Sequence, residues 1–426
     1  MGEDARAARG AGAAAHGSAA SAPRASVHLS ARACLGRLIQ LEANSMKVTD
    51  VRTFLVHPGS GKNWLFVKVE TDAGIHGWGE CYTQSDRDRS IEAHVEELAR
   101  YLIGRDPYNI KHFTYMVYND FASKRGAMDL YSAVSGIEQA LWDIVGKSLG
   151  TPVYNLLGGA CRDKIRVYAN GWGMRLTDGD GERAQARVAE GFSALKFDPF
   201  PGPWRTHISR EDEDAAVDCV RGIREAVGPK VDLLIEVHRR LAPMHAIRVA
   251  RRIEEFEPFW YEEPVSSMNI DALADVRRAI DLPVVTGEEL YTKAEFREVL
   301  EKQAADILNA DVCNCGGILE LKEIGAMAEP YFVIMSPHNY NSTSVALAAT
   351  VHACAVMPNF LITEYFVNFA EVANAITVDP WRVEDGYVAL PTGPGLGIEL
   401  DEEALEHYAY KQFPARSLPQ FGAEGP

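Results

Sequence analysis

The chain has 426 residues, a formal net charge of −17 and a hydrophobic content of 47%. This length is enough for two or three domains with large cores. The acidic balance excludes a uniformly basic surface, so we expect neither nucleic acid nor an anionic membrane as a partner. No apolar run reaches the roughly 18 residues that a membrane-spanning helix needs. An acidic protein that binds an anion must do so locally, through a metal or a few Arg and Lys side chains.

The seven cysteines are scattered along the chain and odd in number. This usage is typical of reduced thiols and predicts a cytoplasmic protein. Cys313 and Cys315 form a C-x-C, but no second Cys or His cluster follows at a spacing that suits zinc. We therefore interpret that pair as structural.

Residues 1–45 differ from the rest of the chain. They are rich in Ala, Arg, Gly and Ser and have little hydrophobic patterning, which predicts a disordered extension. The small number of acidic residues is also compatible with a transit peptide. We favour a third interpretation, in which the extension reflects an upstream start codon and the native protein begins at Met46.

Residues 46–163 have the pattern of a small α+β domain. Alternating apolar residues and a turn at Thr71–Gly74 predict strands, and longer periodic segments predict helices. The predicted strands are Val48–Val56, Trp64–Glu70 and Ile75–Glu80, and the predicted helices include Arg89–Ile103 and Ser132–Leu149.

From residue 164 onward, short apolar runs alternate with charged amphipathic segments such as Asp212–Val227 and Pro243–Phe256. Strands that alternate with helices of this length predict βα units around a parallel sheet. Eight such runs suit an α/β barrel of the TIM type, whose catalytic groups lie at the carboxyl ends of the strands. The predicted strands are Ile165–Ala169, Ala194–Phe197, Leu233–Val237, Phe259–Tyr261, Pro283–Thr286, Ile307–Val312, Val333–Ser336 and Phe360–Thr363.

Ionisable residues end six consecutive predicted strands. From the third strand to the eighth they are Glu236 and His238, Glu262 and Glu263, Glu288 and Glu289, Asp311, His338, and Glu364. Glu236, Glu262 and Glu288 are spaced 26 residues apart, which is one βα repeat, so the three side chains can converge at the barrel mouth. Three carboxylates form a hard oxygen site suited to Mg²⁺. A single strand-end Glu would be interpreted as a helix cap or a solvated side chain, but three at equal intervals favour a metal site.

Motifs in a fixed order along the chain carry a resemblance to a known family. They are G-W-G-E (Gly77–Glu80), SGIEQALWDIVGK (Ser135–Lys147), LGG (Leu157–Gly159), EEP (Glu262–Pro264), GE at Gly287 and Glu288, and GGI (Gly316–Ile318). From about Met46 to about Ala415 the chain resembles the enolase superfamily and its mandelate racemase subgroup. Within that subgroup it is most similar to the galactonate dehydratase family of acid-sugar dehydratases.

The resemblance implies a fold and a domain division. The fold is a (β/α)7β TIM-like barrel at residues 164–390, with an N-terminal α+β capping domain at residues 46–163. A C-terminal segment, residues 391–426, returns to complete the capping domain.

The resemblance also implies a role for each strand-end residue. Glu236, Glu262 and Glu288 would hold one Mg²⁺ per active site. His238 would be the base that removes the proton next to the substrate carboxylate, and a neutral histidine suits that task because its ordinary pKa is about 6.5. The remaining assignments are His338 as the general acid, Asp311 as its supporting partner, Glu364 on a substrate carboxylate oxygen, and Lys196 as the first Lys of the family's K-x-K.

Two departures from the family pattern concern the substrate. Glu236 stands where the galactonate enzymes have Asp, and Asp198 replaces the second Lys of K-x-K, which argues against a racemase with two opposed bases. Asp198 either contacts a sugar hydroxyl or pairs with an arginine. Arg240 matches the family's H-x-R and either contacts the sugar or forms a surface ion pair.

The predicted activity is Mg²⁺-dependent dehydration of a small-molecule sugar acid to a 2-keto-3-deoxy acid. A sugar-acid cycloisomerase or epimerase is the alternative within enzymes, and an inert metal-binding scaffold is the alternative outside them. Taken singly, His238 and His338 would each pass for structural histidines, but with three carboxylates at matched strand ends the functional interpretation is favoured. We expect loops near Pro58–Asn63 and Tyr82–Arg89 to select the substrate, and we expect a homo-oligomer whose subunit number is open.

Overall fold

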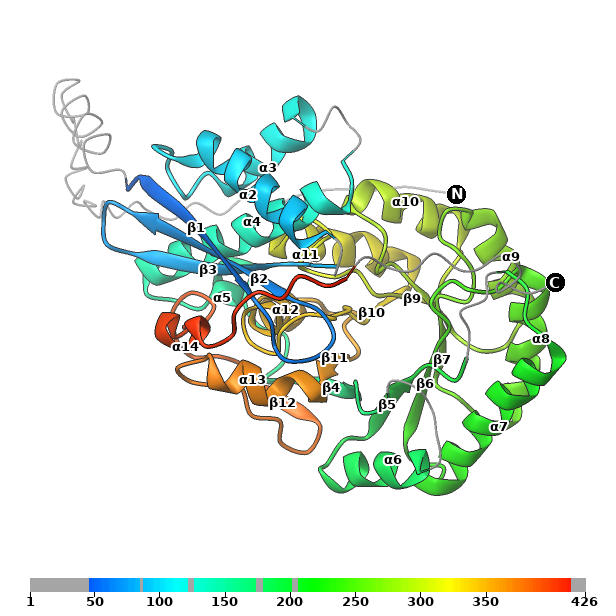
Figure 1. Cartoon of the computed structure of the whole chain (residues 1–426). Helices are drawn as coiled ribbons and strands as arrows, with labels where there is room; N and C mark the ends of the chain where they lie inside the picture. The colour runs from blue at the N-terminus through cyan, green and yellow to red at the C-terminus, as the bar shows by residue number, and fades with distance from the viewer. Residues whose placement is uncertain (1–45, 85–86, 122–125, 174–178, 201–205, 415–426) are drawn as a thin grey trace, which may run out of the picture. The chain divides into compact units, whose positions relative to one another are not determined.

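A computed structural model describes residues 46–84, 87–121, 126–173, 179–200 and 206–414 (Figure 1). The predicted extension 1–45 and the end of the C-terminal segment lie outside these residues. None of the described helices is both long and apolar enough to cross a bilayer.

The first described part of the chain is a three-stranded antiparallel sheet with helices packed on it. The strands follow the order β1 (Val48–Val56), β2 (Trp64–Thr71) and β3 (His76–Cys81), and the helices are α2 (Asp88–Leu102), α3 (Ile110–Met116), the π-helical turn η1 (Val117–Phe121), α4 (Met128–Leu149) and α5 (Val153–Leu156). The G-W-G-E motif has a packing reason, because a Cβ atom at Gly79 would lie 1.8 Å from the carbonyl oxygen of Gly136 in α4. The glycines of β3 therefore let the sheet and α4 approach closely.

Parallel strands from the middle of the chain form the barrel. Their hydrogen-bonded order is β10-β9-β8-β7-β6-β5-β4-β11, and a bridge from Met335 to Phe360, just before β11, joins the two edges. The strands are β4 (Lys164–Asn170), β5 (Ala194–Phe197), β6 (Asp232–Glu236), β7 (Trp260–Glu262), β8 (Val284–Thr286), β9 (Ile307–Leu308), β10 (Ile334–Met335) and β11 (Thr363–Phe366). The helices between them are α6 (Asp180–Ala189), α7 (Arg210–Val227), α8 (Pro243–Ile253), α9 (Ile270–Ala279), α10 (Thr292–Lys302), α11 (Ile318–Ala328) and α12 (Val345–Ala355). The short 3-10 turns η2 (Glu254–Phe256) and η3 (Glu329–Tyr331) extend α8 and α11. The predicted (β/α)7β fold is confirmed.

The barrel interior has an apolar layer below a polar one. Its apolar cluster is Tyr168, Ala194, Leu234, Trp260, Val285, Ile307 and Ile362. Side chains two positions apart on a strand share a face, so the residues two positions further along point into the barrel one layer higher. On β4 to β7, β9 and β11 that higher layer is Asn170, Lys196, Glu236, Glu262, Asn309 and Glu364, all of them polar.

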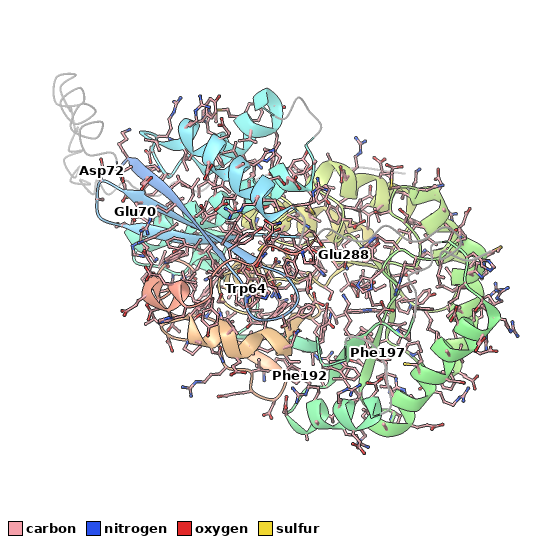
Figure 2. The ribbon with its side chains drawn as sticks, viewed as in Figure 1. Trp64, Glu70, Asp72, Phe192, Phe197 and Glu288 are labelled. Atoms are coloured by element: carbon pink, nitrogen blue, oxygen red, sulfur yellow. The ribbon has the colours of Figure 1, made fainter. Side chains whose placement is uncertain are left out.

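The end of the described chain returns to the antiparallel sheet. The 3-10 turn η4 (Val367–Phe369) and α13 (Ala370–Ala375) follow the barrel, β12 (Tyr387–Ala389) pairs with β4, and α14 (Glu402–Glu406) precedes a bridge between Ala409 and Val56. Trp64, at the start of β2, lies where the sheet meets the barrel, whereas Glu70 lies near the far end of that strand (Figure 2). The predicted completion of the capping domain by the C-terminal segment is therefore confirmed as far as residue 414.

One predicted strand is displaced. Phe360–Thr363 was expected as the eighth strand, but the regular pairing with β4 covers Thr363–Phe366. Phe360 enters only as an isolated bridge to Met335, so the apolar run marks the approach to the strand rather than the strand itself. The prediction followed hydrophobicity, and the paired residues include Glu364, a buried ionisable residue that bonds to Asn170 and pairs with Lys196.

Candidate active site

Three buried carboxylates converge at the barrel mouth. Glu236 and Glu262 end the neighbouring strands β6 and β7 and are register partners, and Glu288 follows β8. One oxygen from each carboxylate lies within 4.8 Å of the other two, and the three side chains are buried. The equal spacing in the sequence therefore does place these groups together.

The donor set fits a divalent cation. All three groups offer carboxylate oxygens, the ligands that Mg²⁺ prefers. Glu262 Oε2 is buried and has no hydrogen-bond partner among the described residues, which is costly unless a cation binds it. Burial and repulsion from Glu236 raise the pKa of Glu262 well above its ordinary value, and a bound cation would relieve that repulsion. Glu288 differs, because Arg239 and His338 outweigh the effect of burial and lower its pKa.

Lys196 connects this cluster to Glu364. Its Nζ lies 2.5 Å from Glu262 Oε1, 3.0 Å from Glu236 Oε2 and 3.4 Å from Glu364 Oε1. Burial alone would lower the pKa of Lys196, but these carboxylates raise it well above the ordinary value. Glu364 also accepts hydrogen bonds from Asn170 Nδ2 at 2.7 Å and from the amide of Asn339 at 2.9 Å.

His338 is a buried histidine surrounded by carboxylates. Its Nδ1 lies 2.8 Å from Asp311 Oδ2, and its Nε2 lies 3.4 Å from Glu288 Oε2 and 3.5 Å from Glu364 Oε2. Burial alone would lower the pKa of His338, but Glu364, Glu288 and Asp311 raise it. The protonated ring is therefore favoured, which is the form that can donate a proton.

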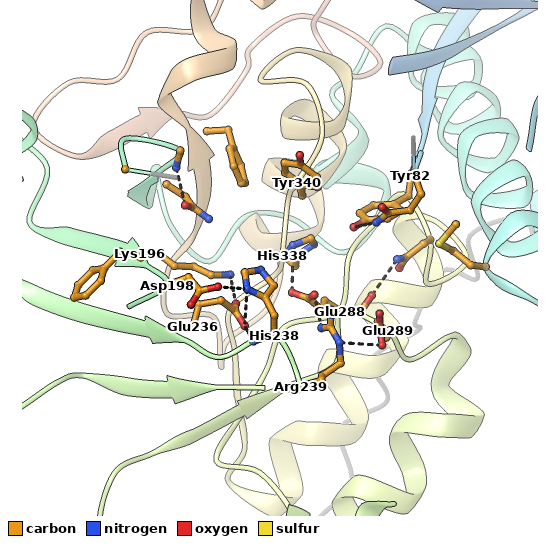
Figure 3. Close-up of a pocket in the computed structure, with 18 of the residues that line it drawn as sticks. Tyr82, Lys196, Asp198, Glu236, His238, Arg239, Glu288, Glu289, His338 and Tyr340 are labelled. Carbon is orange, nitrogen blue, oxygen red and sulfur yellow. Dashed lines mark hydrogen bonds and ion pairs between the residues drawn. The ribbon is translucent and has the colours of Figure 1, made fainter. Parts of the chain in front are cut away.

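His238 has a similar pairing in a more open position. Its Nδ1 lies 2.8 Å from Asp198 Oδ2, and its side chain, 47% exposed, lines the pocket (Figure 3). Burial would lower the pKa of His238, whereas Glu236 and Asp198 raise it. Because Nδ1 faces Asp198, the other ring nitrogen of the neutral form is free to accept a proton.

Arg240 bonds to the same Asp198 carboxylate that pairs with His238. Its Nη2 donates to Asp198 and its Nε donates to the carbonyl of Val237 at 2.9 Å. Of the two alternatives for Asp198, the structure has the pairing with an arginine and adds the pairing with His238. The predicted contacts of Asp198 and Arg240 with substrate stay predictions.

Arg239 occupies the pocket wall beside the carboxylate cluster. Its Nη1 lies 2.5 Å from Glu288 Oε1 and its Nε lies 3.0 Å from Glu289 Oε2. The backbone of His238 and Arg239 is left-handed, with φ of 53° and 62°. Such strained positions concentrate at functional sites, and here they turn two consecutive side chains toward one pocket.

A cavity of about 360 Å³ is lined by Glu236, Glu288, His238 and His338, whereas Glu262 lies behind its lining. Figure 3 shows Tyr82 and Tyr340 on the side of His338, and Lys196 and Asp198 beside Glu236 and His238. Tyr82 comes from the antiparallel domain and the other six come from the barrel, so both domains build the wall of the pocket.

Three polar partners were missed from the sequence. Asn170 binds Glu364, Asn309 Nδ2 donates to Glu262 Oε1 at 2.9 Å, and Asn341 Nδ2 donates to Asp311. Asn170 ends the first barrel strand and Asn309 lies two residues before Asp311, so the strand-end rule could have found both. No sequence signal marked Asn341, which lies in the loop that follows β10.

Comparison with known families agrees with this geometry. Residues 180–404 match the family described as enolase C-terminal domain-like, and residues 47–158 match the N-terminal domain of mandelate racemase and muconate lactonizing enzyme. The chain belongs to this family of the enolase superfamily, as its motifs predicted.

Individual relatives cover most of the chain. D-galactonate dehydratase of Xanthomonas euvesicatoria pv. vesicatoria is 38% identical over 371 residues, which are 85% of this chain and 94% of that protein. The crystal structure of mandelate racemase/muconate lactonizing enzyme from Sulfitobacter sp. has a TM-score of 0.81 and 37% identity, covering 86% of this chain and 96% of the other. A mandelate racemase/muconate lactonizing enzyme-like protein from Roseovarius sp. TM1035 has a TM-score of 0.80 and 39% identity over the same shares.

Proposed function

We propose that the protein is a Mg²⁺-dependent hydro-lyase that dehydrates a sugar acid to its 2-keto-3-deoxy acid. The observation that carries this proposal is the meeting of three buried carboxylates with two histidines, each paired with its own carboxylate, in one pocket. The relatives named D-galactonate dehydratase support the reaction class and make galactonate the first substrate to test.

Glu236, Glu262 and Glu288 would hold Mg²⁺, which supplies Lewis-acid stabilisation of the negative charge that develops on the substrate carboxylate. Enolase-superfamily sites combine a His or Lys base with one or two Mg²⁺ ions that stabilise the enediolate. We assign the orientation of the substrate carboxylate to Lys196 and Glu364, which lie beside the ligand cluster.

In this mechanism His238 takes the proton from C2 of the sugar acid, and the electron pair of that bond forms the enediolate. Asp198 holds the tautomer that leaves the accepting nitrogen free. His338, held by Asp311 and favoured in its protonated form, donates a proton to the C3 hydroxyl, which leaves as water. The resulting enol tautomerises to the 2-keto-3-deoxy acid.

The test is a screen of sugar acids, beginning with galactonate, with Mg²⁺ present and 2-keto-3-deoxy product as the readout. Exchange of the C2 proton in D₂O is measured in parallel. Dehydration of any of them supports the proposal. If C2 exchange is accompanied by formation of an isomer, the protein is an epimerase or cycloisomerase instead. If no sugar acid in the screen gives either dehydration or C2 exchange, the proposed activity is rejected.

We also propose the domain boundaries 46–163, 164–390 and 391–426 and a homo-oligomeric state. The boundaries are supported by the change from antiparallel to parallel strands between β3 and β4. Limited proteolysis tests the boundaries, and light scattering tests the oligomer.

A further inference from the structure

A lysine of the antiparallel domain reaches the barrel just behind the pocket wall. Lys62 lies in the loop between β1 and β2 and is 2% exposed. The loop can approach because residue 61 is glycine: a Cβ atom there would lie 3.1 Å from Phe369 and 3.3 Å from the hydroxyl of Tyr340. Gly61 also has a left-handed φ of 74°, so the position favours glycine twice.

The ammonium group of Lys62 makes two hydrogen bonds and contacts two aromatic rings. Its Nζ donates to the carbonyl of Thr83 at 3.1 Å and to Asn341 Oδ1 at 3.2 Å. It also lies 4.0 Å from the ring centre of Tyr82 and 4.5 Å from that of Tyr340. A desolvated cation between two aromatic rings is strongly held. Both rings line the pocket, whereas Lys62 stands behind them.

A chain of directional hydrogen bonds leads from Lys62 to His338. An ammonium group can only donate, so the oxygen of the Asn341 amide must face Lys62 and its NH₂ must face the other way. That NH₂ lies 3.1 and 2.9 Å from the two oxygens of Asp311. Asp311 in turn accepts from His338 Nδ1 at 2.8 Å. Each group in the chain restricts the orientation of the next.

Neighbouring carboxylates offset part of the cost of burying the Lys62 ammonium group. Burial lowers its pKa to about 8, and the nearby carboxylates of Asp311 and Glu80 limit the decrease. Loss of this side chain would leave a buried amide oxygen without a donor and two aromatic rings without the cation between them, which permits the Asn341 amide and both rings to move.

We propose that Lys62 is a positioning residue that holds Asn341, Asp311 and His338 in the geometry for proton donation, so that the acid half of the site depends on the antiparallel domain. The inference rests on the proposed function for its kinetic consequence, but not for its structural one. It gives the predicted specificity loop Pro58–Asn63 a second task, the alignment of a catalytic group.

The test compares Lys62→Met with Lys68→Met in the full chain. Lys68 is a matched control, because it lies in the same domain with its Nζ 5.6 Å from the ring centre of Trp78 and paired with Glu402, away from the pocket. We expect Lys62→Met to lower the kcat of dehydration about 10- to 100-fold, a large share of what a general acid contributes, with C2 exchange reduced less than about threefold. Lys68→Met should change neither rate. Lys62→Arg, which keeps a cation that stacks on aromatic rings, should recover most of the kcat.

A readout independent of turnover is the Nδ1 proton of His338, observed by NMR in protein with ¹⁵N-labelled histidine. Its exchange with solvent should be slow in the parent protein and in Lys68→Met, and at least tenfold faster in Lys62→Met. If Lys62→Met does not fold, Lys62→Gln is measured against the same criteria. An unchanged proton signal in the neutral variant, or a loss of kcat in Lys62→Arg as large as in Lys62→Met, would overturn the inference. If the parent protein turns over no sugar acid, the proposed function fails, and the Nδ1 proton still decides the role of Lys62.

Discussion

Two sets of buried carboxylates differ in how their oxygens are used. Glu80 and Glu138, from the antiparallel domain, are bonded to barrel helices: Glu80 accepts from the amides of Ser342 and Ala346 near the start of α12, and Glu138 accepts from two amides at the start of α11. The carboxylates at the barrel mouth instead face one another, and within the described part of the chain Glu262 Oε2 has no hydrogen-bond partner.

Burial alone therefore does not mark a functional carboxylate. Burial raises the pKa of Glu138 to about 7, as it also raises the pKa of Glu262, so titration does not separate the two sets. The two sets differ in the groups that their carboxylate oxygens contact. A carboxylate that accepts helix amides joins two parts of the fold, whereas carboxylates that converge on one point can hold a cation.

The largest effect is expected for the carboxylates at the barrel mouth. Glu262→Gln removes one anionic ligand, and since the metal contributes several kcal/mol to catalysis, we expect kcat to fall by a factor of about a thousand or more. Mg²⁺ affinity, measured by calorimetry on protein first stripped with EDTA, should fall with it. Full activity of the EDTA-treated variant would remove Glu262 from the metal site.

The next effect separates the two histidines. His238→Asn should abolish both dehydration and C2 proton exchange, with a loss of about 10² to 10⁴, because the first step needs the base. His338→Asn should reduce dehydration by a similar factor while part of the exchange survives, since enolisation precedes the departure of water. Proton NMR of C2 with saturating Mg²⁺ measures both. The opposite pattern would reverse the two roles.

Substitution of Glu138, one of the two carboxylates that accept helix amides, should lower the stability of the protein and leave its catalysis unchanged. Glu138→Ala leaves the amides of Ile318 and Leu319 without acceptors, which should lower the free energy of unfolding by about 2 to 4 kcal/mol. In the folded variant kcat should stay within about threefold of the parent, because Glu138 does not line the pocket. Glu301→Ala, on the exposed face of α10, is the control and should change stability by less than about 1 kcal/mol. A loss of kcat at full stability would contradict the distinction between the two sets.

The smallest effect concerns a buried histidine without a carboxylate. Burial lowers the pKa of His352 to about 4, and its Nδ1 accepts from the amide of Tyr154. As the pH falls from 6.5 to 4, the unfolded chain takes up a proton that the folded chain refuses, so stability decreases by up to about 3 kcal/mol. His352→Gln should lose less stability over that range. Denaturant titrations at pH 7 and pH 4.5 provide the comparison, and equal losses would show that His352 does not titrate as described.

Much of the site could be predicted because catalytic groups in a barrel end strands that the sequence reveals. The equal spacing of Glu236, Glu262 and Glu288 reflects one βα repeat, and period-two alternation on β7 turns Trp260 and Glu262 to the same side. The ordered motifs identified the superfamily for the same reason, since close packing such as that of Gly79 on α4 requires particular residues at particular places.

The pairing of side chains that are distant in the sequence depends on the tertiary structure. Asp198 is 40 residues from His238, and Asn341 is 279 residues from Lys62, so no local pattern could associate them. Periodicity along the chain was therefore sufficient to predict the barrel, the carboxylate trio and the two strand-end histidines, because each follows from the period of a strand or of a βα repeat. Only the folded chain decided that Asp198 serves His238 and that Lys62 enters the barrel behind Tyr82, because hydrogen bonds between distant loops depend on where the backbone brings them and leave no periodic trace in the sequence.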